Sequence, residues 1–128
     1  MNLAQAKLRK DYLKLKHNQS LLLLIKTQNI LNKLQTQCPK SKVILLTPIV
    51  RYDKTTNDLG LSLQDYIAKI KEVAAARSIL VADIHTPTAD KMPEGVFADK
   101  AHPNMYGHQI MAQALQTWLE ENVDIVLD

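Results

Sequence analysis

The spacing of apolar residues predicts a chain of helices with two short strands among them. Four segments have apolar positions at helical spacing and no interior proline: residues 3–16, 21–37, 61–76 and 110–119. Asn18 and Ser20 supply a possible break between the first two segments. The pattern leaves open whether residues 3–37 form one helix or two.

The unbroken apolar run at residues 43–46 favours a strand that is covered on both faces, as in a parallel sheet. This strand is expected over residues 43–50, and a second strand over residues 79–84. The helical segment between them makes a βαβ unit, whose crossover is expected to be right-handed. Functional sites of open parallel sheets gather beyond the carboxyl ends of the strands. We therefore expect chemistry in the loop from His85 to His102, while residues 122–127 could be a strand or an ordered tail.

The most informative polar residues stand directly before the last helical segment. Asp99 and His102 are three apart, so one turn can hold both, with the carboxylate accepting the imidazole Nδ1–H and leaving Nε2 free as a base. Pro103 and Asn104 suit the end of such a turn, because proline fixes its own backbone and asparagine is a favoured helix N-cap. An isolated pair at this spacing is more often plain loop polarity.

The surrounding motif, Asp-x-x-His-Pro-Asn-x-x-Gly at residues 99–107, resembles the last conserved block of the SGNH hydrolases, also called GDSL lipases and esterases. Residues 43–48 and 79–84, with the helix between them, are similar to the closing strand, helix and strand of that family. The resemblance covers about residues 20–120. It implies a three-layer α/β/α, flavodoxin-like parallel sheet, of which this chain holds the C-terminal βαβα part together with N-terminal helices.

The resemblance also implies catalytic roles for Asp99 and His102, which in the family serve a serine nucleophile. The family places that serine in a Gly-Asp-Ser block and an oxyanion donor in a Gly-x-Asn-Asp block, and neither is found here. None of the four serines follows Gly-Asp: Ser20, Ser41, Ser62 and Ser78. Asn57-Asp58 lacks the glycine and is better explained as turn chemistry.

Length and composition favour one domain over residues 1–128, with 46% hydrophobic residues for a modest core. The single cysteine, Cys38, excludes an intrachain disulfide and has no nucleophile signature around it. No cofactor or metal site is expected, because His102 and His108 are six apart and no glycine-rich phosphate loop occurs.

The net charge of +3 hides an asymmetry, because residues 1–42 carry nine Lys or Arg and one acid. The basic residues follow a helical pattern with almost no aromatic residues among them, which indicates a solvated helix face rather than nucleic-acid binding. The apolar run Leu21–Ile25 is too short to cross a membrane, and no targeting signal is convincing. A cytoplasmic protein without membrane contact is the default expectation.

Two functions of different classes follow. The first is the C-terminal portion of an SGNH-type ester hydrolase, inactive alone and able to use an ester substrate only if the missing part completes it. The alternative is a non-enzymatic remnant or interaction module that binds a partner through an exposed strand edge or the basic N-terminal helix. In either case an uncovered edge on the strand at residues 43–50 predicts self-association, binding of a complementary fragment or marginal stability. The competing outcome is that the N-terminal helices fold over this edge, with the apolar stripe from Leu21 to Leu34 as a lid.

Overall fold

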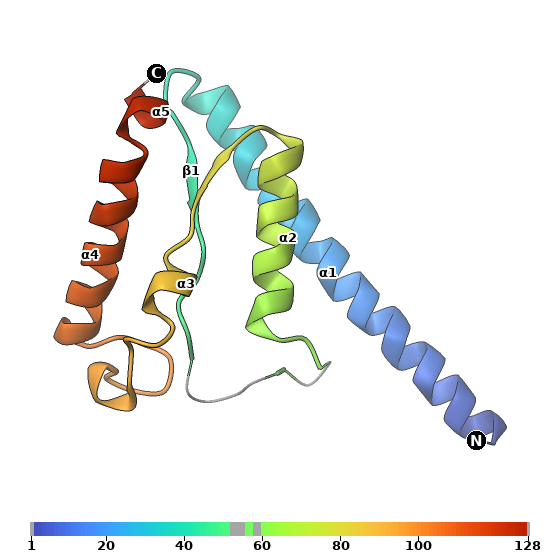
Figure 1. Ribbon diagram of the computed structural model, residues 1–128. Helices are drawn as coiled ribbons and strands as arrows, with labels where there is room; N and C mark the ends of the chain where they lie inside the picture. Colours follow the sequence, from blue (N-terminus) through green and yellow to red (C-terminus); the bar gives the residue numbers. More distant parts are fainter. Residues whose placement is uncertain (1, 52–55, 58–59, 128) are drawn as a thin grey trace. The chain divides into compact units, whose positions relative to one another are not determined.

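The computed structural model describes residues 2–51, 56–57 and 60–127, without the side chains of residues 11–13 and 15–21 (Figure 1). Its contacts divide the chain into two compact units. The first unit comprises Met1–Ser41 with Thr56–Val73, and the second comprises Lys42–Thr55 with Ala74–Asp128. Each unit is described by itself, and the single domain expected from the sequence stays a prediction.

Most of the first unit is one continuous helix, α1 (Leu3–Gln37), so Asn18 and Ser20 do not break it. Each polar residue of this type costs a helix only about 0.5–0.7 kcal/mol relative to alanine, and no glycine or proline lies within the helix. Asn2 caps its start, because the Asn2 side chain accepts from Gln5 N–H at 2.8 Å and the Gln5 side chain accepts from Asn2 N–H at 3.1 Å.

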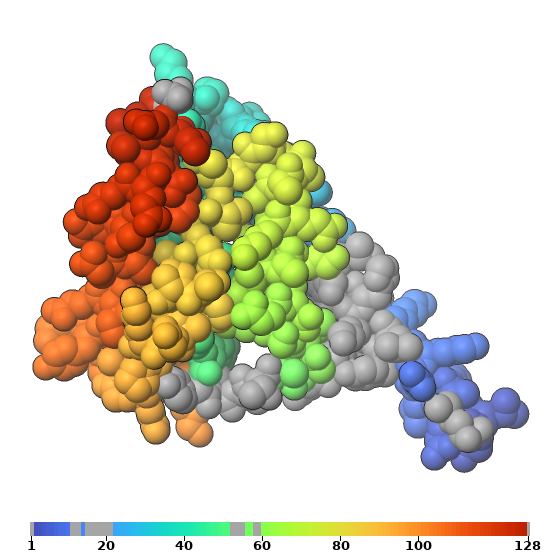
Figure 2. All heavy atoms as spheres, viewed as in Figure 1, coloured from blue at the N-terminus to red at the C-terminus, as the bar shows by residue number. Residues whose placement is uncertain are grey.

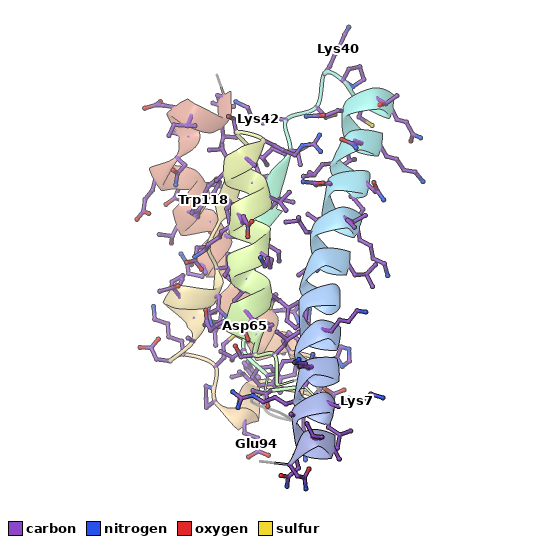
Figure 3. All side chains as sticks on the ribbon, turned by 90° about the vertical axis from the view of Figure 1, so that its right-hand side faces the viewer. Lys7, Lys40, Lys42, Asp65, Glu94 and Trp118 are labelled. Atoms are coloured by element: carbon purple, nitrogen blue, oxygen red, sulfur yellow. The ribbon has the colours of Figure 1, made fainter. Side chains whose placement is uncertain are left out.

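The second long helix, α2 (Leu63–Ala76), begins at a capping box. Asp65 accepts from Ser62 N–H at 2.7 Å, and Ser62 Oγ accepts from Asp65 N–H at 3.2 Å; Figure 3 shows Asp65 at this end of the helix. Ile67 and Val73 are buried, as the helical stripe predicted. The helix starts two residues later than the stripe because this cap defines its first turn.

The second unit contains a parallel pair of strands, β1 (Ile44–Leu46) and β2 (Leu80–Ala82), with Leu45 opposite Val81. The α/β fold class with a parallel sheet is therefore confirmed. Both strands are shorter than predicted. Pro48 cannot donate a ladder hydrogen bond, and Ile84 N–H donates to the Thr47 side chain instead of to a strand.

The rest of this unit follows β2. The stretch predicted as a loop contains a helical turn, α3 (His85–Thr88), and a 3₁₀ turn, η1 (Glu94–Val96). The last long helix is α4 (Met105–Glu121), and the tail forms a short helix, α5 (Val123–Leu127), rather than a strand. Lys42, labelled in Figure 3, holds this tail by donating to Ile125 O at 2.8 Å.

The core of the second unit lies where the strands meet the segment that follows them. Its buried apolar side chains include Ala82, Ile84, Met92 and Phe97. α3 and η1 both contact α4, and Figure 2 shows the atoms of this part of the chain beside that helix. No helix in the described part of the chain is long and apolar enough to cross a membrane.

Candidate active site

The Asp-His pair predicted from the sequence is hydrogen-bonded in the structure. Asp99 Oδ2 lies 2.7 Å from His102 Nδ1. The other carboxylate oxygen, Oδ1, accepts from the backbone N–H groups of Ala101 and His102, both at 2.7 Å. Both side chains are exposed, His102 to 80% and Asp99 to 59%. The turn therefore holds the carboxylate by three donors while the imidazole faces solvent.

These donors lower the pKa of Asp99 from 3.8 to about 2. The backbone N–H groups of Ala101 and His102 contribute most, followed by the His102 side chain. A carboxylate ionised at neutral pH can only accept, so the bonded Nδ1 must carry the proton. In the neutral ring the lone pair is then on Nε2, which is the arrangement of a general base.

Backbone hydrogen bonds close the loop around this pair. Ala98 N–H donates to His102 O at 2.8 Å, and Asn104 N–H donates to Val96 O at 2.9 Å. Phe97 and Pro103 form an antiparallel bridge between these two bonds. Because Phe97 is also buried, the loop is fixed to the core on the side away from the exposed His102 ring.

Asn104 connects the loop to α4. Its Oδ1 accepts from the N–H groups of Tyr106 at 3.0 Å and Gly107 at 3.1 Å, so it is the N-cap predicted from the sequence. Its Nδ2 donates to Gly95 O at 2.9 Å. A Cβ on Gly107 would collide with Val96 O and lie 2.6 Å from Pro103 Cβ. Glycine thus allows the start of α4 to lie close against the loop that carries Asp99 and His102.

A buried junction joins the carboxyl ends of the strands. Thr47 is 1% exposed; its hydroxyl donates to Asp83 Oδ1 at 3.2 Å and accepts from Ile84 N–H and His85 N–H, both at 3.0 Å. The Asp83 carboxylate also accepts from Thr86 N–H at 3.0 Å and Thr86 Oγ1 at 2.8 Å. The hydroxyl and the carboxylate together fix the start of α3.

For Asp83 and His85 the sequence favoured loop polarity, with a cap of the following loop by Asp83 as the alternative. The structure shows that cap, because Asp83 accepts from Thr86 N–H and Thr86 Oγ1. His85 is buried, and its Nδ1 lies 2.9 Å from Pro48 O, to which it donates. Sequence reasoning also missed Thr47. The available signal was the strand register, because Leu46 opposite Ala82 places Thr47 beside Asp83.

The other polar candidates bond locally. Asn57 donates to Tyr66 Oη at 2.8 Å and accepts from Leu61 N–H at 3.0 Å, which fits the turn chemistry predicted for it. Its place relative to His102 is not defined, because it belongs to the first unit.

The His108 Nδ1 lies 2.9 Å from Asn104 O, and Cys38 is exposed at the end of α1. The side chains of His17 and Ser20, and all of Asp58, lie outside the described residues.

Among the described side chains, none with a nucleophilic group bonds to the pair. Within the described side chains the His102 ring bonds only to Asp99. Ser62, the one serine with a carboxylate partner there, bonds to Asp65 at 3.1 Å and belongs to the other unit. No group of three or more His, Cys, Asp or Glu residues in this part of the chain could hold a metal ion.

An open groove of about 570 Å³ runs along α4 from Tyr106, near the start of the helix, to Glu121 at its end. One wall is the segment from Asp83 to Lys91. The other is a single face of α4 with residues three or four apart: Tyr106, Gln109, Ile110, Gln113, Ala114, Thr117, Trp118 and Glu121. Figure 3 labels Trp118 on this helix.

Comparison with known proteins finds relatives by structure. No family model and no curated protein matches the sequence. A solved protein from Lactobacillus plantarum is 25% identical with a TM-score of 0.63, over 71% of this chain and 50% of that one. A member of the lipolytic protein G-D-S-L family from Veillonella parvula is 26% identical with a TM-score of 0.53, over 70% and 50%.

The esterase domain of the zebrafish ZfL2-1 retrotransposon ORF1 protein shares the fold, with 15% identity, a TM-score of 0.65 and coverage of 80% of this chain and 60% of that one. The chain spans about half the length of the two bacterial neighbours. In fold as in sequence, the chain therefore resembles the SGNH hydrolases, the GDSL-type lipolytic proteins, over about half of their length.

Proposed function

We propose that this chain is part of an SGNH-type ester hydrolase, in which His102 is the general base and Asp99 is the carboxylate that orients it. The observation that carries the proposal is the 2.7 Å contact between Asp99 Oδ2 and His102 Nδ1, on a carboxylate that two backbone N–H groups also hold. Two neighbours at 25% and 26% identity, one of them from a lipolytic family, support the same assignment.

In this reaction a nucleophilic hydroxyl attacks the ester carbonyl and loses its proton to His102 Nε2. His102 then returns that proton to the leaving alcohol, and the same base activates the water that releases the acyl group. Asp99 stays ionised and stabilises the imidazolium. In serine proteases, removal of such a carboxylate costs a factor of about 10⁴ in rate.

The hydroxyl in this scheme comes from outside the described residues, because the His102 ring bonds only to Asp99 among them. The chain alone is therefore expected to be inactive. The apolar part of the ester would lie in the groove along α4, whose wall includes Ile110, Ala114 and Trp118. Apolar walls with a few polar groups are typical of small-molecule sites.

The second candidate, a non-enzymatic interaction module, is favoured by a separate observation. Within the described residues β1 pairs with β2 only, and Leu46 is 44% exposed. An apolar strand with a free edge is a template for another chain. The two candidates differ in the role of His102. The hydrolase uses His102 as a general base, whereas a binding module does not need a base whose lone pair faces solvent.

An ester assay tests the activity assigned to the chain. With a short-chain nitrophenyl ester, the isolated chain should release alcohol no faster than the same concentration of free imidazole, because no nucleophile lies beside His102. His102→Ala and His108→Ala are matched variants, since both rings are exposed and only His102 bonds to Asp99.

Turnover well above the imidazole control that is lost in His102→Ala and kept in His108→Ala would contradict inactivity and reveal a nucleophile within the chain. Turnover that survives both substitutions would show that the activity does not use the pair, and would count against the hydrolase assignment.

A further inference from the structure

The outer edge of β1, meaning the backbone N–H and C=O groups of Ile44 and Leu46, points away from β2. Thr47 N–H donates to Ala82 O at 3.2 Å, so Thr47 faces β2. Backbone groups of alternate strand residues point to the same side, so Leu45 faces β2 as Thr47 does, and Ile44 and Leu46 face the opposite side. Within the described residues the sheet has no third strand to pair with this edge.

This edge is short, but it lacks the other features that usually block the pairing of edge strands. Residues 44–46 contain no charge, no proline and no bulge. They are three consecutive apolar residues, and Leu46 is 44% exposed even though it belongs to the sheet. Lys42 comes earlier and Pro48 later, so the open part of the edge is limited to Ile44 and Leu46.

We propose that a second copy of this chain pairs with the outer edge of β1, antiparallel and about a two-fold axis at Leu45. Directly opposite residues of a hydrogen-bonded antiparallel pair exchange both backbone bonds. Ile44 of one copy then faces Leu46 of the other, and the symmetry repeats this pair. Four hydrogen bonds join two two-stranded sheets into one of four strands.

A second copy fits this edge because the edge is self-complementary, as a two-fold interface requires. Ile44 and Leu46 lie symmetrically about Leu45, and each has one outward backbone N–H donor and one outward C=O acceptor. The same register places Lys42 of one copy opposite Pro48 of the other, so no like charges face each other. Pro48 has no N–H and stops the ladder there, which keeps the association weak and dependent on concentration.

The outer edge of β2 is less suitable. Its one residue with outward groups is Val81, because Leu80 and Ala82 face β1. Ile79 N–H, the next donor on that side, already donates to Ala74 O at 2.9 Å. Val81 therefore offers a matched control position, with the same backbone orientation at the opposite edge.

Sedimentation velocity over a hundredfold range of concentration tests the proposal with the whole chain. The wild type should shift from monomer to dimer. Leu46→Pro removes the outward backbone N–H of residue 46 from each copy and leaves the hydrogen bonds between β1 and β2 in place. The association constant should therefore fall at least tenfold. Val81→Pro places the same residue on the other edge and should associate like the wild type.

Amide hydrogen exchange of the wild type gives a second readout that needs no variant. The Ile44 and Leu46 amides should exchange more slowly as the concentration rises, while the Val81 amide should not change. A chain that stays monomeric throughout, as it would if a different polypeptide belonged on this edge, overturns the proposal. Equal association of wild type and folded Leu46→Pro also overturns it. Both readouts are independent of esterase activity.

Discussion

The exposed Asp99–His102 pair is ordered by local backbone geometry rather than by burial. The Asp99 carboxylate accepts from two N–H groups of its own turn, at 2.7 Å each. Because its folded pKa of about 2 lies below the ordinary 3.8, the carboxylate stabilises the turn above about pH 4 and loses this effect as the pH falls through 2. The Asp99 carboxylate is therefore ionised at neutral pH, where it can accept from His102 Nδ1.

Gly107 gives a prediction at the residue scale. Replacing a glycine within a helix by alanine normally stabilises it by up to about 1 kcal/mol. Gly107→Ala should instead destabilise the chain by roughly 1–3 kcal/mol, because the new Cβ meets the backbone oxygen of Val96 and the Pro103 ring. Urea unfolding followed by circular dichroism measures the change.

Gly95→Ala is the matched control, because a Cβ at Gly95 meets no atom within 4 Å. Its unfolding midpoint should stay close to that of the wild type. Equal midpoints for the two variants would show that the close approach of α4 to the loop does not constrain Gly107.

The residues of the pair could be predicted from the sequence because their geometry is local. Asp99 and His102 are three apart, and the Asn104 cap contacts residues two and three further on. Thr47 could not be found in this way. Its partners, Asp83 and His85, lie 36 and 38 residues away and are brought together by strand register.

At the element scale, the sequence predicted the helices and strands whose periodicity is clear. It did not predict the residues at which they begin and end. α1 continues through Asn18 and Ser20 because nothing there costs enough to stop it. β1 ends at Leu46 because the next residues, Thr47 and Pro48, use their polar groups in the junction. The tail of six residues showed no decisive periodicity, and it is helical from Val123.

The junction gives a prediction at this scale. Thr47→Val keeps the shape of the side chain and removes its hydroxyl, which leaves the N–H groups of Ile84 and His85 without their acceptor. The chain should lose about 2–4 kcal/mol of stability, because each buried unpaired donor costs about 1–3 kcal/mol. Denaturant unfolding measures the loss.

Thr47→Ser is the control, since it keeps the hydroxyl and removes only a methyl group. It should lose about 1 kcal/mol, the value of one buried methyl group. If Thr47→Ser destabilised the chain as much as Thr47→Val, packing rather than hydrogen bonding would hold the ends of the strands.

At the scale of the whole molecule, the α/β class could be predicted because one βαβ pattern specifies it. The arrangement of the two compact units could not be predicted, since no local pattern reports it. The chain spans about half of its bacterial neighbours, and among the described side chains the His102 ring bonds only to Asp99. In the proposed reaction, the Asp99–His102 pair would contribute the orientation of one imidazole.

That orientation is measured directly by two-bond proton–nitrogen NMR of the His102 ring, at a pH where the ring is neutral. The account predicts a proton on Nδ1 and none on Nε2, with loss of this preference in Asp99→Ala and no change in the His108 ring. A proton on Nε2 in the wild type, or the same spectrum in Asp99→Ala, would contradict the assignment of His102 as a base oriented by Asp99.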